Sequence, residues 1–130
     1  MFLHLLKDNQ KLEFLKLARR MIDADDVALD TEKAYLYRLF REAGLRAHDR
    51  EVPRDAIADP AVFDSRRARV AAAVEMLVLA LIDGDFDANE KAMADEILEQ
   101  FGIGDDDQAD IGRAADNIVE AYALVSKLTD

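Results

Sequence analysis

Cysteine is absent from this chain of 130 residues, and histidine is rare. Without cysteine the protein forms no disulfide, holds no thiolate-bound metal and uses no thiol nucleophile. The two histidines, His4 and His48, lie far apart and lack the close spacing of a histidine metal site. Neither of the two serines, Ser65 and Ser126, stands in a nucleophile-elbow sequence. These absences argue against nucleophilic chemistry, and we expect a protein that is not an enzyme.

A membrane-spanning stretch is also missing. The longest apolar run, Val70–Ile82, has 13 residues, and Glu75 is its one charged member. A span needs about 20 residues, so this run predicts a buried core helix and no membrane insertion. The first residues of the chain show no long apolar region with a small-residue cleavage site. We therefore expect no secretory signal and a cytoplasmic location.

Positive charge is scarce in the second half of the chain. Residues 1–69 hold 14 Lys/Arg and 13 Asp/Glu, whereas residues 70–130 hold 3 Lys/Arg and 15 Asp/Glu, and the net charge is −11. Phosphate-backbone binding needs clustered cations, so we expect no nucleic-acid partner. The acidic half favours a cation, a basic protein partner, or solubility alone. Arginines gather in residues 46–69, where they form either a solvated surface or an anion-binding patch.

Apolar residues recur at helical spacing along most of the chain, and no segment alternates as a strand does. With 51% hydrophobic residues, the chain is long enough for one sizeable core, so residues 1–130 predict a single domain. The pattern predicts an all-α, compact bundle of five main helices plus one or two short ones. The main helices are expected over 9–22, around 35–43, from Asp64 or Ser65 to Ile82 or Asp83, from Asp87 to Gly102, and after Asp105–Asp107.

Glycines mark the ends of two of these helices. Gly44 and Gly102 each follow an apolar helical stripe, and glycine readily takes the left-handed conformation just past a helix end. Leu45 and Ile103 then stand where a residue folds back onto the helix. At the other end of the fourth helix, Asp87 and Glu90 fit a capping box.

The chain contains an internal repeat. Leu17–Asp23 aligns with Leu77–Asp83 at an offset of 60 residues, and Glu32–Ala34 aligns with Glu90–Ala92 at an offset of 58. The first acidic loop is therefore two residues longer than the second. The repeat predicts two pseudo-symmetric helix–acidic loop–helix units. Packing about a pseudo-two-fold axis would bring both acidic loops to one side of the molecule.

The acidic loops carry several carboxylates within a few residues, which suits a hard divalent cation. The second loop begins like an EF-hand, but Ala88 replaces the required glycine at its sixth position and Ala94 the bidentate glutamate at its twelfth. Asp23 and Asp83 follow helix C-termini, where an anion is disfavoured by about 0.3–1 kcal/mol. Either all these acids are caps and solvated loop residues, or the loops form one or two cation sites.

The second loop, Ile82-Asp83-Gly84-Asp85-Phe86-Asp87-Ala88-Asn89-Glu90, together with its weaker copy about sixty residues earlier, resembles the signature of the TerB-like family. That family is named for a tellurite-resistance protein, and the resemblance covers about residues 11–103. It implies a compact, all-α, cytoplasmic, non-enzymatic domain with an acidic metal-binding surface and a role in stress responses such as tellurite resistance.

Residue by residue, the resemblance implies that Asp83 and Glu90 are metal ligands, supported by Asp85. In the first loop Asp23 and Glu32 take these positions, supported by Asp25 or Asp26, but Ala24 replaces the glycine and the loop is longer. The expected ligand is a divalent cation, with Ca²⁺, Mg²⁺, Mn²⁺ and Zn²⁺ as candidates. The alternative is an acidic protein-interaction module that binds a basic partner without metal.

Overall fold

The described part of the protein is helical. A computed structural model describes residues 2–24, 34, 38, 39, 41, 42, 44, 59–82 and 88–130, and none of these forms a strand. For this part of the chain the all-α prediction is confirmed. Its elements are the 3₁₀ turn η1 (Leu3–Leu5), helix α1 (Asp8–Ala24), the 3₁₀ turn η3 (Pro60–Val62), and helices α3 (Arg66–Leu81), α4 (Ala88–Gln100) and α5 (Asp105–Thr129).

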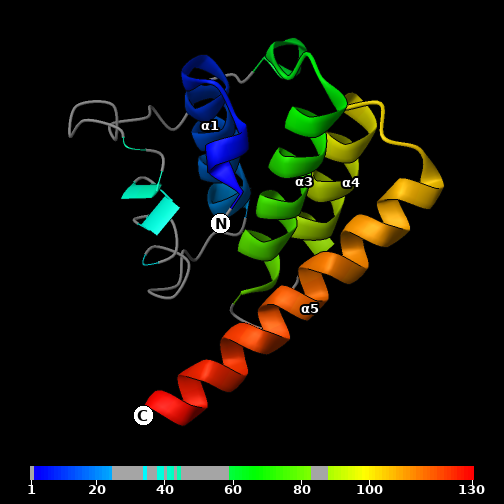
Figure 1. The fold of residues 1–130 in the computed structure, drawn as a ribbon. Helices are drawn as coiled ribbons and strands as arrows, with labels where there is room; N and C mark the ends of the chain where they lie inside the picture. Colours follow the sequence, from blue (N-terminus) through cyan, green and yellow to red (C-terminus); the bar gives the residue numbers. More distant parts are fainter. Residues whose placement is uncertain are drawn as a thin grey trace.

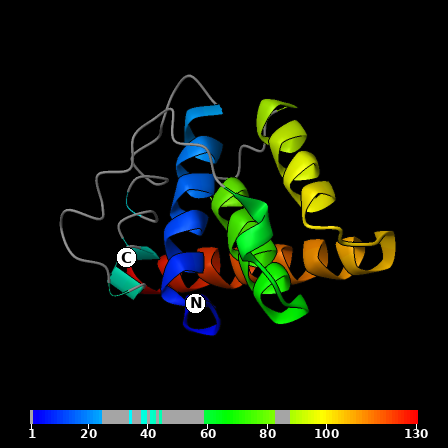
Figure 2. The same ribbon diagram turned by 90° about the horizontal axis from the view of Figure 1, so that it is seen from above.

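Helix α3 lies at the centre of this arrangement. It packs against α1, α4, α5 and η1. Figure 1 shows α1 and α3 running in the same direction, with α4 running back beside α3. Figure 2 shows α5 running across the other helices. A central helix of this kind must be apolar on every side, because each side faces another element.

The sequence of α3 meets this demand. Every residue from 71 to 80 is buried, and six of these ten are alanine or valine residues with short side chains that let neighbouring helices approach closely. The helix begins at Ser65, whose Oγ accepts a hydrogen bond of 3.1 Å from the N–H of Ala68. The sequence predicts the start of this helix at Asp64 or Ser65, and Ser65 satisfies an N–H group that the first turn leaves without a helical partner.

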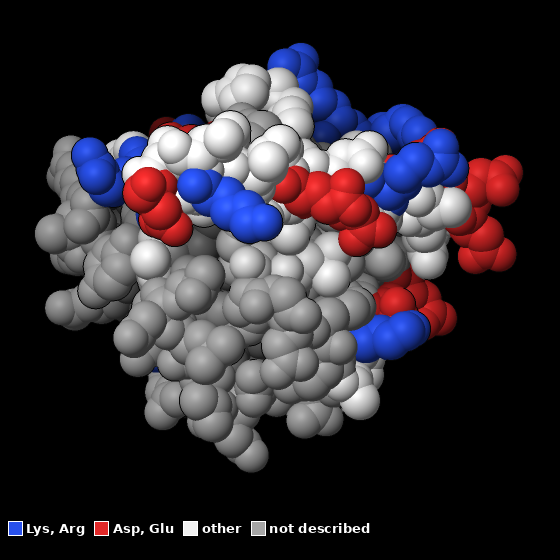
Figure 3. Space-filling view, turned by 90° about the horizontal axis from the view of Figure 1, so that it is seen from below, with Lys and Arg blue, Asp and Glu red and all other residues white. Residues whose placement is uncertain are grey.

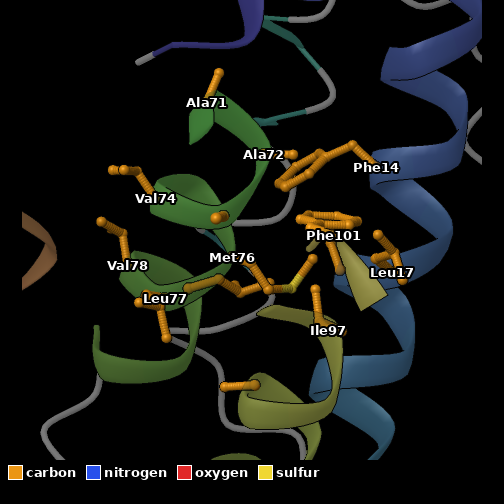
Figure 4. Packing of buried hydrophobic residues seen from close by; sticks show 14 of the residues in the cluster. Phe14, Leu17, Ala71, Ala72, Val74, Met76, Leu77, Val78, Ile97 and Phe101 are labelled. Carbon is orange, nitrogen blue, oxygen red and sulfur yellow. The ribbon is translucent and has the colours of Figure 1, made fainter. Parts of the chain in front are cut away.

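The core fills the space between α1, α3 and α4. Figure 4 shows Phe14 and Leu17 of α1 pointing toward Met76 of α3, toward Ile97 of α4 and toward Phe101, which directly follows α4. All five side chains are buried.

An aromatic pair closes one end of this core. The ring of Phe63, just after η3, lies 5.0 Å from the ring of Phe101 at a tilt of 54°. Tilted pairs at this separation add about 0.5–1.5 kcal/mol beyond the burial of their area.

Helix α4 ends as the sequence predicts. Gly102 has a φ of 67°, its N–H donates to the carbonyl of Glu99 at 2.9 Å, and the N–H of Ile103 donates to the carbonyl of Leu98 at 3.2 Å. These two bonds form a Schellman motif, and Ile103 folds back against the core.

The predicted second helix lies largely outside the described residues. Its described members Arg38, Leu39, Arg41 and Glu42 are helical, and Leu39 is buried. Gly44 has a φ of 69° and its N–H donates to the carbonyl of Arg41, as a helix end at this glycine requires. The five-helix count and the pseudo-symmetry of the two units remain predictions.

The N-terminal residues form a short arm that docks on α3. Leu3 and Leu6 of this arm are buried, and the N–H of Phe2 donates to Oε1 of Glu75 at 2.6 Å. Glu75, the single charged residue of the central apolar run, is itself only 1% exposed. A carboxylate buried to this extent needs hydrogen-bond donors, and the backbone of the arm supplies one.

A buried glutamine fixes the start of α1. The Oε1 atom of Gln10 accepts from the N–H of Lys7 at 2.8 Å, which is the backward half of a capping box. Its Nε2 donates to the carbonyl of Val62 at 2.9 Å and to Oδ1 of Asp64 at 3.1 Å. Gln10 thus joins the beginning of α1 to the segment that leads into α3.

Candidate metal centre

Three helix ends that border the predicted acidic loops lie at the same end of the molecule. In Figure 4, α1 and α3 run downward and α4 runs upward, as the order of their labelled residues shows. The C-terminal ends of α1 and α3 therefore lie at the same end of the bundle as the N-terminal end of α4 (Figure 1). The loops themselves lie outside the described residues, so their predicted placement on one side of the molecule stays a prediction.

Two of the predicted ligand residues belong to these helix ends. Asp23 lies in the last turn of α1, one residue before the helix ends at Ala24. Glu90 is the third residue of α4, and α4 begins directly after Asp87, which the sequence assigns as its cap. The other predicted ligands, Asp25, Glu32, Asp83 and Asp85, lie outside the described residues, as do Asp26 and Asp87.

The electrostatics of these ends favour positive charge. A helix C-terminus carries a partial negative charge of about half a unit, and lysine or arginine in the last turn normally offsets it. Neither α1 nor α3 has a basic residue in its last turn. Asp23 adds a formal negative charge where the helix dipole already disfavours one. A cation bound beyond these ends would relieve both effects.

The described part of the chain shows no cluster of side chains that could hold a metal ion. Within residues 2–24, 59–82 and 88–130, together with the isolated described positions between them, no group of three or more His, Asp or Glu side chains is placed to hold a metal ion. Figure 3 shows the molecule from below, toward the C-terminal ends of α1 and α3, and the described residues there carry charges of both signs. The prediction of a cation site therefore rests on the acidic loops alone.

The triple aspartate at the start of α5 has a structural role. Asp105, Asp106 and Asp107 lie in the first turn of α5, where the helix dipole favours negative charge. Asp107 also accepts a hydrogen bond of 2.6 Å from Nη1 of Arg66, the first residue of α3. This hydrogen bond, together with the attraction of the guanidinium charge, lowers the pKa of the Asp107 carboxyl. These acids are explained without a metal.

The same contact accounts for part of the arginine-rich segment. Arg66 compensates an acidic neighbour, and Nη1 of Arg69 donates to the carbonyl of Phe63 at 3.2 Å. The interpretation as a solvated surface that compensates an acidic neighbour is supported at Arg66, whereas Arg69 bonds a backbone carbonyl. Residues 46–58 of the segment lie outside the described part.

Sequence reasoning missed two polar residues that hold the structure together. Glu75 stood out as the one acid in an apolar run, which is the available signal for a buried and partnered carboxylate. Gln10 gave no such signal, because a glutamine near a helix start is ordinarily exposed. Both anchor chain segments far apart in sequence, and neither belongs to the predicted metal site.

Comparison with family models, curated proteins and solved structures returned no match for this chain. Over the described residues, no helix combines the length and the apolar character needed to cross a membrane.

Proposed function

We propose that this protein is a non-enzymatic, divalent-cation-binding protein of the TerB-like type, located in the cytoplasm and acting in a stress response such as tellurite resistance. The proposed ligands are Asp83, Asp85 and Glu90 in the second loop, and Asp23, Asp25 and Glu32 in the first. One observation carries the proposal: the ends of α1, α3 and α4 that border both loops lie at the same end of the molecule.

Acids lie at both kinds of helix end in this protein, at the N-terminus of α5 and at the C-terminus of α1. The acids at the start of α5 are accounted for by a helix N-terminus and by Arg66. Asp23 lies in the last turn of α1, where the helix dipole disfavours an anion and no basic residue is present in that turn. In the sequence Asp83 takes the matching place after α3, which ends at Leu81 with Ile82 as its cap. Oxygen ligands in this number suit Ca²⁺, Mg²⁺ or Mn²⁺ best, and carboxylates also bind Zn²⁺.

The site would bind and not catalyse. Carboxylates on turns that are open to water keep pKa values that suit neither a general acid nor a general base at neutral pH. An aspartate or glutamate with its ordinary pKa is ionised at neutral pH, which is the state that a bound cation requires.

The test is calorimetric titration of the protein with Ca²⁺, Mg²⁺, Mn²⁺ and Zn²⁺ in turn, followed by thermal unfolding with each ion. We expect at least one ion to bind at sub-millimolar concentration and to raise the unfolding temperature. At 100 times its dissociation constant, a bound ion stabilises the fold by about 2.7 kcal/mol. The double variant Asp83→Asn/Glu90→Gln should lose both the heat and the stabilisation.

A matched control removes two acids elsewhere. Asp105→Asn/Asp106→Asn makes the same change in net charge at the start of α5, where the acids are explained by the helix terminus. This variant should bind the ion as the wild type does. If no ion gives heat or stabilisation at sub-millimolar concentration, or if both double variants weaken binding equally, the cation proposal fails.

The second candidate function is an acidic interaction module that binds a basic partner without metal. The exposed acids of α4 and α5 favour it, among them Asp95, Glu96, Glu99, Asp105 and Asp106. Such a partner should be captured in a salt-sensitive way, because exposed charges are screened. Capture that survives a chelator would favour the module, and capture that a chelator abolishes would favour the cation site.

A further inference from the structure

The last turns of α5 expose a cluster of apolar side chains. Leu124 is 58% exposed, Val125 56% and Leu128 75%. Among the described residues only Leu12, at 36%, is a further exposed large hydrophobic side chain. Figure 1 shows this end of α5 extending past α3. Exposed apolar clusters of this kind mark interaction sites more often than scattered single residues do.

The exposed residues form one stripe along the helix. Ala121, Leu124 and Leu128 follow each other at spacings of three and four residues, with Asn117 one turn before them and Val125 at their side. All five are exposed. This is the a/d spacing by which one helix packs along another. Beside the stripe lies a groove of about 640 Å³ lined by Ile118, Tyr122 and Val125, among others.

Two charges of opposite sign border the stripe on one side. Glu120 and Lys127 are seven residues apart and therefore occupy equivalent positions next to the apolar stripe. Both are exposed, and neither makes an ion pair with another residue in the described part of the chain. Two helical turns separate them by about 10 Å along the axis, which is too far for them to pair with each other.

A second copy of the same helix would complement this pattern. When two copies of α5 pack in antiparallel orientation about a two-fold axis near Leu124, Glu120 of each copy lies opposite Lys127 of the other. Two identical ion pairs then flank one shared apolar seam. In a parallel pair a position of this kind faces a residue five places further along the partner, so Glu120 would lie beside Val125 and would gain no ion pair. The charge order therefore fits an isologous antiparallel contact.

We propose that the protein forms a two-fold symmetric homodimer through the last turns of α5, with Leu124, Val125 and Leu128 in its seam and Glu120–Lys127 pairs at its edges. The seam is short, because it spans only two or three helical turns per copy. Stable interfaces bury about 800 Å² on each partner, and a seam of two or three turns is smaller than that. We therefore expect a reversible dimer with a dissociation constant in the micromolar range.

The first test is sedimentation equilibrium of the full chain from about 5 µM to about 500 µM, where a reversible dimer dissociates on dilution. We expect the wild type to shift from monomer to dimer over this range. Leu124→Asp/Leu128→Asp should raise the dissociation constant at least about 10-fold, because it places charges in the seam. Circular dichroism and thermal unfolding at low concentration check that this variant, altered only at exposed positions, keeps the fold.

The second test is a charge swap, which separates this geometry from any other dimer. Glu120→Lys and Lys127→Glu should each weaken the dimer about 3- to 30-fold, since each replaces two attractive pairs by two repulsive ones. The double variant Glu120→Lys/Lys127→Glu restores both pairs and should return the dissociation constant to within about 2-fold of the wild type. Glu99→Lys, an exposed change on α4, is the control and should leave the dimer unchanged.

Three results would overturn the proposal. A wild type that stays monomeric up to about 500 µM would do so, whether or not another partner binds this surface. A dimer that tolerates the two aspartates in the seam forms through a different surface. A double swap as weak as the single variants would exclude the antiparallel two-fold arrangement.

Discussion

Helices α3 and α5 both carry apolar residues, but they meet different surroundings. Every residue of α3 from 71 to 80 is buried, whereas Ile111 and Ala115 are the buried residues of α5, and its last turns are exposed. The exposure of the last turns of α5 follows from the different lengths of the two helices. With 16 residues α3 spans about 24 Å, and with 25 residues α5 spans about 37 Å. The longer helix extends past the elements that cover it. An apolar stripe in the sequence therefore predicts which face of a helix can be buried, but it does not predict whether another element packs on that face.

The largest predicted effect comes from making the same substitution in both helices. Leu79→Ala in α3 removes a side chain that is 1% exposed, and we expect it to lower the free energy of unfolding by about 2–5 kcal/mol through lost burial and a cavity. Leu128→Ala in α5 removes one that is 75% exposed, and the expected change is within about 0.5 kcal/mol. Urea unfolding at low protein concentration measures both. Equal losses would show that the end of α5 is covered in solution.

An intermediate effect is expected from the buried acid of α3. Glu75→Ala leaves the N–H of Phe2 without its acceptor, and we expect a loss of about 1–3 kcal/mol in unfolding free energy. Amide hydrogen exchange in residues 3–6 should become faster, because the arm loses its anchor. Glu75→Gln keeps an acceptor oxygen and should lose less.

Glu120→Ala in α5 is the control for Glu75, since it removes the same side chain from an exposed position. At low protein concentration it should leave the unfolding free energy within about 0.5 kcal/mol of the wild type. If Glu75→Ala changes neither stability nor the exchange of the arm, the buried hydrogen bond does not anchor it.

The smallest effect is expected where α3 and α5 are joined by an ion pair at the surface. Arg66 lowers the pKa of Asp107, so the pair stabilises the fold above the ordinary carboxyl pKa of about 3.9. That contribution disappears as the pH falls through the lowered pKa of the folded state. Asp107→Asn should therefore unfold at a slightly lower temperature than the wild type near neutral pH, and the two should converge in acid.

Thermal unfolding as a function of pH measures this difference, and Asp106→Asn serves as the control. Asp106 shares the first turn of α5 with Asp107, so it feels the same helix dipole, but no ion pair of it is present among the described residues. Added salt should reduce the Asp107 effect, because both members of the pair are partly exposed. A deficit in Asp107→Asn that persists below pH of about 2 would rule out the ion pair as its cause.

Local signals in the sequence predicted the helices and their ends. The period of apolar residues located α1, α3, α4 and α5, although α1 continues to Ala24 and not to Ile22. Ser65 and Gly102 act where they were expected, since a capping oxygen and a left-handed glycine depend only on neighbouring residues. Such features follow from physics that acts within one helical turn.

Longer-range features could not be predicted in the same way. No residue close to Phe2 in the sequence indicates that its N–H donates to Glu75. No residue close to Leu128 indicates that α5 extends beyond the helices packed against it. Both depend on where distant segments come to lie. The same holds for the candidate metal site. The sequence predicts which carboxylates belong to it, but the distances between those carboxylates depend on how the two loops lie relative to each other.

The docking of the N-terminal arm on α3 also sets an order of events in time. Phe2 and Glu75 are separated by 73 residues, and Gln10 and Val62 by 52. During synthesis at about 5–20 residues per second, the arm waits roughly 4–15 s before Glu75 has been made. Closing so long a loop also carries an entropic cost that must be met before the contact forms. The arm is thus made well before the helix that covers it, and the burial of Leu3 and Leu6 depends on a segment that is made later.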